Sequence, residues 1–347
     1  MRVIFQNRAY ACPSGKRRRN FERCLRTTIA AIAASLLVSV SSLSAGAQNY
    51  PNEVIKIIVP FAAGGGVDVV ARIIGPKLSE ALGQPVIIEN RGGAGGMLGA
   101  AAVAKAAPDG YTLLLGTGST HGTNSSVYKK LSYDPIRDFT PVVLVSQSPL
   151  MLLVRPTLAA KSVAELIALA RDEPGKLTFG SYGFGSITHL SAELFTTMAN
   201  IQAKHVPYRG SAPALVDLLG GHIDFVFDGI QTSLAYVRSG KLRLLGIASL
   251  TRTPLLPDAP TISETLPGFD TTLWFGLFAP ADTPKPIVDK INGKMNAVLA
   301  LPEVRESFAK LGFDVVGGGP DILAQRVDTE LKRWVDLVRE KNINVEP

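Results

Sequence analysis

The chain has 347 residues, with 36 Lys or Arg against 29 Asp or Glu and a formal net charge of +7. Eight of the basic residues and one acidic residue lie in the first 26 positions, so 28 residues of each sign remain beyond them. The excess charge therefore belongs to the N-terminal segment, and the balance elsewhere argues against nucleic acid as a partner. Both cysteines, Cys12 and Cys24, lie in the same segment, and the remaining residues, about 300, can form a large core without disulfides.

The first 47 residues have the pattern of a secretory signal peptide. The basic stretch precedes an uncharged apolar run, Thr27–Val40, and then Ala45-Gly46-Ala47, which fits a small-residue cleavage site. The apolar run is short for a membrane span, although an uncleaved anchor remains an alternative. We expect cleavage before Gln48 and a periplasmic location.

The next segment predicts a strand, a glycine turn and a helix. Ile55–Val59 is apolar and β-branched, as in a buried strand, and Pro60 ends it. Gly64–Gly66 then turns the chain into a helix predicted over Val69–Leu82. Free N–H groups and the helix dipole make such a turn a candidate anion site, and a tight turn without a ligand is the alternative. Asp68 is a candidate cap for this helix.

Two further strands, Val86–Glu89 and Tyr111–Gly116, complete a βαβαβ pattern with parallel strands. The second of them leads into a polar loop, Thr117–Asn124. Open parallel sheets bind ligands beyond the carboxyl ends of their strands. This loop and the glycine turn should therefore lie at the same edge of the sheet.

A second α/β series occupies residues 177–248, and again polar residues follow the strands. Two extended segments, Val142–Val154 and Thr271–Phe278, connect it with the first series. Because Val142–Val154 contains Pro149, we predict an edge or crossover strand and not a central one. Two α/β units joined by two crossings indicate a hinged clamshell that holds its ligand in the cleft.

Signatures of catalysis are largely missing. The glycine loops complete neither a P-loop nor a dinucleotide fingerprint, and Gly183-Phe184-Gly185-Ser186 has its serine one place late for a nucleophile elbow. Ser186 and His189 could form a nucleophile and base, but a third member is not evident, so an exported hydrolase is a minor alternative. The four histidines lack zinc-ligand spacing. We expect no enzyme activity, no metal and no cofactor.

The polar loops suit neutral recognition of an anion. They supply Ser and Thr hydroxyls and backbone N–H groups, while Gly64–Gly66, Thr117–Thr120 and Ser186–Thr188 contain no Lys or Arg. Ionised acceptors make strong hydrogen bonds with neutral donors, so such loops can hold a small mono- or dicarboxylate. A phosphate ester would more often recruit basic residues. Ordinary capping and turn formation is the alternative for each hydroxyl.

Five segments carry a resemblance to a known family. They read VPFAAGGGVDVVAR, IIENRGGAGGMLGAAAVAKAAPDGYTLLLGT, GSYGFGSITHLSAELF, HVPYRGSAPALVDLLGGHID and LPDAPTISE. In this order they resemble the Bug-type periplasmic receptors of tripartite tricarboxylate transporters, over nearly the whole chain after residue 47. The resemblance implies a two-lobed class II periplasmic-binding-protein fold that closes on a small carboxylate, and docking of the bound protein onto a membrane permease.

The resemblance also implies which residues bind the ligand. The first loop contributes Phe61, Ala62, Gly65, Gly66 and Asp68, and the second contributes Thr117, Ser119 and Thr120. The other lobe contributes Ser186, Thr188, Tyr208 and Asp228, of which Asp228 either binds the ligand or braces the hinge. Gly92-Gly93 departs from the Pro-Gly that the family often has there, but leaves the ligand loops untouched.

We expect lobe 1 to comprise residues 48–148 and 278–347, and lobe 2 to comprise residues 149–277. The expected partners are a small carboxylate and the permease subunits of a transporter, with the receptor as a monomer. A ligand-sensing subunit that acts on a signalling protein would have the same fold and site, so the sequence leaves that alternative open.

Overall fold

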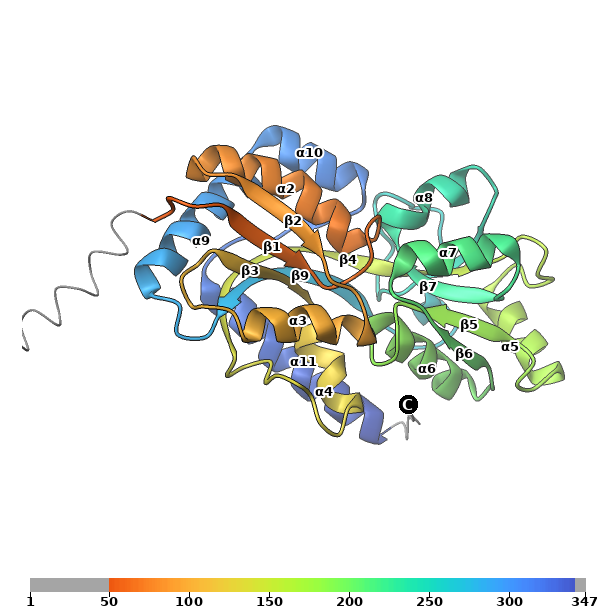
Figure 1. Ribbon diagram of the computed structural model, residues 1–347. Helices are drawn as coiled ribbons and strands as arrows, with labels where there is room; N and C mark the ends of the chain where they lie inside the picture. Colours follow the sequence, from red (N-terminus) through yellow and green to blue (C-terminus); the bar gives the residue numbers. More distant parts are fainter. Residues whose placement is uncertain (1–49, 341–347) are drawn as a thin grey trace, which may run out of the picture. The chain divides into compact units, whose positions relative to one another are not determined.

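The computed structural model describes residues 50–340, so the expected signal peptide lies outside the described part of the chain. One long strand, β4 (Phe139–Val154), runs through the centre of the structure and belongs to two sheets (Figure 1). We call these sheet A, which β4 forms with its first half, and sheet B, which it forms with its second half. Both hydrophobic cores are built around this shared strand.

Sheet A contains six of the described strands. They are β2 (Val86–Asn90), β1 (Ile55–Val59), β3 (Thr112–Thr117), β9 (Thr272–Pro280), β4 and the short β10 (Asp314–Val315). The strand β1 pairs in parallel with β2 and β3, whereas β9 is antiparallel to both β3 and β4. The carboxyl ends of β1 and β3 therefore lie at the same edge, as the sequence predicts.

Sheet B continues from β4. It contains β7 (Phe225–Gly229), β5 (Thr178–Ser181), β6 (Lys204–Pro207) and β8 (Arg243–Ile247). The strand β5 lies between β7 and β6 and is parallel to both, and β4 pairs with β7 and with β8 in antiparallel fashion. The structure thus has the expected two α/β units.

Helices cover both faces of each sheet. Those near sheet A are α2 (Gly66–Leu82), α3 (Met97–Ala104), α4 (Asn124–Val127), α9 (Lys285–Ala300), α10 (Pro302–Lys310) and α11 (Pro320–Glu340). Those near sheet B are α5 (Val163–Asp172), α6 (Ile187–Ala199), α7 (Ser211–Gly220) and α8 (Ile230–Arg238). Short helical turns are η1 (Ala94–Gly96), η2 (Ser119–Thr123) and η3 (Ile262–Glu264). Helices α2, α9 and α10 lie on one side of sheet A, and α3 and α11 lie on the other (Figure 1).

The apolar residues sort into separate clusters on the two sheets. Under α3 and α11, Ile58, Leu114 and Trp274 of sheet A pack with Val103 and Leu323 of the helices. A second cluster places α7 and α8 on sheet B, with residues such as Leu218 and Ile230 against Met151 and Val226. Because most of these side chains are almost fully buried, each unit has a core of its own.

The expectation of an edge or crossover strand is confirmed for the crossover, whereas the expectation that Val142–Val154 is not central is wrong for its second half. The first half of β4 pairs with β9 and, at two positions, with β10, and the second half lies between β7 and β8. Proline is tolerated because of where it stands. Pro149 opposite Thr272 is the last pair of β4 with β9, and Leu150 opposite Gly229 is the first pair with β7. The missing N–H thus falls where β4 leaves sheet A and enters sheet B.

Candidate functional site

The glycine turn after β1 leads directly into helix α2. The helix begins at Gly66, three residues earlier than predicted, and Gly65 occupies the N-cap position without any side-chain cap. Asp68 is therefore the third residue of the helix, and the predicted capping role is wrong in detail. The N–H groups of the first turn are left for another acceptor.

Asp68 instead holds the turn in shape. Its carboxylate accepts hydrogen bonds from Gly64 N (2.9 Å), Arg72 Nε (2.8 Å) and Asn90 Nδ2 (3.0 Å). The carboxylate is 2% exposed. Burial alone would raise the pKa of Asp68, but the hydrogen bonds and the charge of Arg72 lower it below the ordinary value. These three partners already occupy the carboxylate.

The polar loop after β3 folds into a compact turn, with three hydroxyls on its inside. Thr117 Oγ1 accepts from the backbone N–H of Ser119 (3.1 Å) and from that of Thr120 (3.4 Å). Thr120 Oγ1 accepts from Thr117 N (2.9 Å), donates to Thr117 O (3.1 Å) and lies 2.9 Å from His121 Nδ1. All three hydroxyl-bearing side chains are at most 2% exposed. Thr120 is thus committed to the turn itself.

Ser186 and Thr188 are also committed to local structure. Ser186 is the N-cap of α6, and its Oγ accepts from His189 N (3.3 Å). Thr188 Oγ1 accepts from Tyr182 N (2.9 Å) and lies 3.2 Å from Ser186 Oγ. These contacts are the ordinary capping and turn roles that the sequence left open as the alternative.

Loops from the sheet A side and the sheet B side meet directly. Ser119 Oγ accepts from Ile187 N (3.0 Å), Thr123 Oγ1 donates to Gly185 O (2.6 Å), and Ala62 N donates to Arg209 O (3.2 Å). A Cβ on Gly95 would lie 2.5 Å from the carbonyl oxygen of Phe184. The two units are therefore in a closed arrangement, in which main-chain groups touch across the cleft.

A small cavity of about 20 Å³ lies between these loops. Ten residues line it: Phe61, Gly66, Val67, Thr117, Ser119, Tyr182, Ile187, Gln231, Leu273 and Phe275. Phe61, Gly66, Thr117 and Ser119 are among the residues implied by the resemblance. The polar groups come from the ends of β1 and β3 and from α8, and β9 supplies an apolar wall. The cavity therefore combines hydroxyls, a helix N-terminus and apolar side chains.

Sequence reasoning missed Tyr182 and Gln231. Tyr182 faces Phe61 with its ring, at a centroid separation of 6.2 Å in an edge arrangement. Gln231 is the second residue of α8, and both polar atoms of its side chain are buried without a hydrogen-bond partner. Gln231 lies two positions after the end of β7, so the rule that ligands bind beyond the carboxyl ends of strands could have pointed to it.

Tyr208 and Asp228 do not line the cavity. The hydroxyl of Tyr208 donates to Asp217 Oδ2 (2.6 Å). Asp228 is 1% exposed and accepts from the hydroxyls of Tyr182 (2.5 Å), Ser211 (2.6 Å), Thr232 (2.5 Å) and Ser233. Burial raises the pKa of Asp228, and the four hydroxyl donors only partly oppose that effect. Its contacts favour the bracing role over contact with a ligand.

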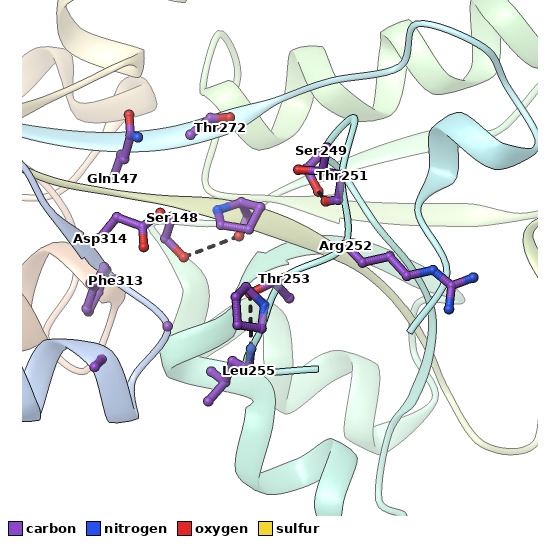
Figure 2. A pocket seen from close by; sticks show the side chains of 14 residues that line it. Gln147, Ser148, Ser249, Thr251, Arg252, Thr253, Leu255, Thr272, Phe313 and Asp314 are labelled. Atoms are coloured by element: carbon purple, nitrogen blue, oxygen red, sulfur yellow. Dashed lines mark hydrogen bonds between the residues drawn. The ribbon is translucent and has the colours of Figure 1, made fainter. Parts of the chain in front are cut away.

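A much larger groove lies beside the crossing strands. Figure 2 shows this space of about 490 Å³, lined by Gln147 and Ser148 of β4, Thr272 of β9, the loop Ser249–Leu255, and the segment around Phe313 and Asp314. Its one cation, Arg252, is paired with Glu264 through two contacts of 3.0 Å. None of the residues implied by the resemblance lines this groove. We therefore assign the candidate site to the smaller cavity.

Between positions 50 and 340, His, Cys, Asp and Glu do not gather in a group of three or more that could hold a metal ion. Over the same range, the helices are too short or too polar to span a membrane.

Comparison with known proteins decides the family. The sequence matches the family model described as "Tripartite tricarboxylate transporter family receptor" over residues 70–343. The chain belongs to this family. The periplasmic binding protein BugD shares 34% identity and superposes with a TM-score of 0.82, over 85% of this chain and 99% of BugD. The receptor is thus a solute-binding protein and not an enzyme, and its two-lobed periplasmic-binding-protein fold is confirmed.

Two solved structures of similar proteins contain carboxylates. MatC from Rhodopseudomonas palustris, solved with bound malate, is 40% identical and has a TM-score of 0.81, over 83% of the receptor and all of MatC. A second R. palustris protein, solved with adipate, is 38% identical with a TM-score of 0.82, over 85% of the receptor and 99% of that chain. Receptors of similar sequence and fold thus bind small organic acids.

Proposed function

We propose that this receptor captures a small carboxylate at the cavity between α2, the turn after β3 and α8. The observation that carries the proposal is a pair of buried hydroxyls beside an uncapped helix N-terminus. Thr117 and Ser119 line the cavity together with Gly66 and Val67, the first two residues of α2. Backbone N–H groups and the positive end of the helix dipole favour an anion at this point.

The hydroxyl hydrogen bonds leave donors for the ligand. Each hydroxyl has one proton to donate and two lone pairs that accept. Thr117 Oγ1 and Ser119 Oγ act as acceptors toward backbone N–H groups, and within residues 50–340 neither hydroxyl donates its proton to another group. Two hydroxyl protons can therefore point at a carboxylate, which makes strong hydrogen bonds with neutral donors.

The malate and adipate bound by the two R. palustris proteins support this class of ligand. We propose direct contact for Phe61, Gly66, Thr117 and Ser119. We propose supporting roles for the other residues implied by the resemblance: Ala62, Gly65, Asp68, Thr120, Ser186, Thr188, Tyr208 and Asp228. Asp68 would shape the glycine turn and Asp228 would brace the start of α8.

Entry of a ligand requires the two units to separate. A cavity of about 20 Å³ is close to the space of one water molecule, far less than a dicarboxylate occupies. We propose that the units rotate about β4 and the segment that precedes β9, with lobe 1 formed by residues 48–148 and the C-terminal part and lobe 2 between them. The pairing of β9 with β4 from Thr272 onward supports a second crossing before Thr272 and not at residue 277.

We further propose that the receptor is exported by a cleavable signal peptide, acts as a monomer in the periplasm, and delivers its ligand to the permease subunits of a tripartite tricarboxylate-type transporter. Membership in this receptor family supports the transporter as partner. A sensor protein in place of the permease is the second candidate, since it would recognise the same closed form.

The hydroxyl pair can be tested by substitution. We expect Ser119→Ala or Thr117→Val to weaken binding of the best organic acid by about 1–3 kcal/mol, because a hydrogen bond to a charged group is lost. Isothermal titration would measure the affinities after a thermal-shift screen has identified the acid. The exposed Ser132 provides a matched control, and Ser132→Ala should bind like the wild type. Unchanged affinity in both cleft variants would refute the proposed carboxylate grip.

Closure can be tested in solution. A ligand that bridges both units shifts the population toward the closed arrangement, so the radius of gyration should fall when ligand is added. Small-angle scattering with and without a saturating acid of measured affinity would detect the change. An identical radius of gyration in the two states would contradict the clamshell mechanism.

A further inference from the structure

The side-chain amide of Gln231 is buried, but the surrounding protein groups do not form hydrogen bonds with it. Among residues 50–340, it is the one side chain for which two polar atoms, Oε1 and Nε2, are both buried and lack a hydrogen-bond partner. A buried amide without partners destabilises the fold unless another molecule supplies them. The amide also lines the cavity of the proposed site, together with Thr117 and Ser119.

Two glycines make room for this side chain. A Cβ on Gly66 would lie 2.1 Å from Gln231 Nε2, and a Cβ on Gly229 would lie 2.0 Å from the same atom. Gly66 starts α2 and Gly229 ends β7, so the amide passes between elements of the two units. The amide is thereby placed next to the helix N-terminus at which we propose that the carboxylate binds.

We propose that Gln231 determines specificity and selects acids that carry a hydroxyl group near the carboxylate. This inference rests on the proposed function and refines its ligand class. An amide both donates through its NH₂ group and accepts through its carbonyl oxygen. A plain carboxylate can only accept, so it would leave Oε1 without a partner. A ligand hydroxyl can donate to Oε1, and the NH₂ group can donate to either ligand oxygen.

An amino group is a poorer match for this site. A buried ammonium needs a carboxylate partner, and the buried carboxylates of α2 and β7 already have theirs. Asp68 accepts from three donors, one of them Arg72, and Asp228 accepts from four hydroxyls. The amide oxygen of Gln231 is neutral. The site therefore favours a hydroxy acid over the corresponding amino acid.

Matched acids that differ by one group test the inference. Isothermal titration of the mature receptor would compare lactate with propionate, malate with succinate, and citrate with tricarballylate, and would add aspartate as the amino counterpart of malate. We expect the hydroxy member of each measurable pair to bind at least about tenfold more tightly, since a site built to bond a hydroxyl rejects the analogue that lacks it. Aspartate should bind more weakly than malate.

The variant Gln231→Met keeps the length of the side chain and removes its donor and acceptor. We expect it to bring the affinity ratio within each pair close to one, through weaker binding of the hydroxy acid. It should leave the midpoint of thermal unfolding of the unliganded protein close to the wild-type value, because water can reach the amide when the two units are apart. Gln325→Met, at an exposed position of α11, is the control and should change neither quantity.

The outcomes separate the two proposals. Equal binding of hydroxy and unsubstituted acids by the wild type, or an unchanged ratio in Gln231→Met, would overturn the role of Gln231 while leaving carboxylate capture intact. If none of the acids binds, carboxylate capture at this cavity fails, and the specificity inference fails with it. The wild-type comparison alone is decisive, so the test does not depend on the folding of the variant.

Discussion

Acidification from pH 6.5 to pH 4.5 should lower the free energy of unfolding by about 4–5 kcal/mol through two buried histidines alone. Burial lowers the pKa of His121 to about 3, and burial together with the charge of His189 lowers the pKa of His205 to about 3. In the unfolded chain both rings regain an ordinary pKa near 6.5. The unfolded state therefore binds more protons in this range, so stability rises with pH and is lost on acidification.

The structural cause of the lowered pKa is clearest at His121. Its ring is fully buried, stacked on Phe278 at a centroid distance of 3.8 Å and packed edge-on against Phe139. Its Nδ1 lies 2.9 Å from Thr120 Oγ1, and its Nε2 has no partner among the described residues. A second proton on this ring would be a buried charge without a partner.

Urea unfolding at several pH values would measure this effect. The variant His121→Phe should reduce the slope between pH 5 and pH 6 by about 1.4 kcal/mol per pH unit, which corresponds to one proton. His222→Gln, at an exposed position, is the control and should keep the wild-type slope. A flat stability profile over this range would contradict the buried neutral state of both rings. The raised pKa of Asp228 acts in the opposite direction, because the folded state then binds a proton more tightly than the unfolded state.

Asp228→Ala should destabilise the protein by about 3–5 kcal/mol, because it leaves several buried hydroxyls without an acceptor. Those hydroxyls belong to the β5–α6 loop and to the starts of α7 and α8. One carboxylate therefore accepts hydrogen bonds from three segments that follow strands of sheet B. In a receptor of this size the loss corresponds to a drop in Tm of roughly 5–8 °C.

A graded series would test this interpretation by calorimetry. Asp228→Asn retains one acceptor oxygen, so its free energy of unfolding should fall by less than that of Asp228→Ala. Asp258→Ala removes an exposed carboxylate of the same kind and should change the free energy of unfolding by less than about 0.5 kcal/mol. Wild-type Tm in Asp228→Ala, together with lost binding, would show that Asp228 contacts the ligand instead of bracing the fold.

The sequence predicts the architecture well because strand ends carry local signals. Glycine turns and hydroxyl loops after Val59 and after Gly116 identify the edge of sheet A, and four residues from these loops do line the cavity. The sequence does not show whether a hydroxyl in such a loop faces the cavity or forms hydrogen bonds within its own loop. The same residue types, Ser and Thr, occur in both groups. The hydroxyls of Thr120, Ser186 and Thr188 form hydrogen bonds within the turn after β3 and at the start of α6, whereas those of Thr117 and Ser119 line the cavity.

The missed residues depend on contacts between distant segments. Gln231, at the start of α8, reaches the cavity only because Gly66 of α2 and Gly229 of β7 leave room for its side chain. Leu273 and Phe275 line the cavity because β9 returns between β3 and β4. Pro149 correctly indicated a crossover strand, but it could not show that the second half of β4 lies between two strands, since the change of partner along β4 is a tertiary feature.

The shared strand β4 also constrains the order of folding. In sheet A its first half pairs only with β9 and β10, and β9 in turn pairs with β3, whose partner residues precede it by about 160 positions. Closing so long a loop is entropically costly and slow, whereas sheet B assembles from a shorter continuous stretch. Sheet A therefore stays incomplete until the last third of the chain is available. In an exported receptor, this delay would keep the polypeptide in a form that can still be threaded through a membrane pore.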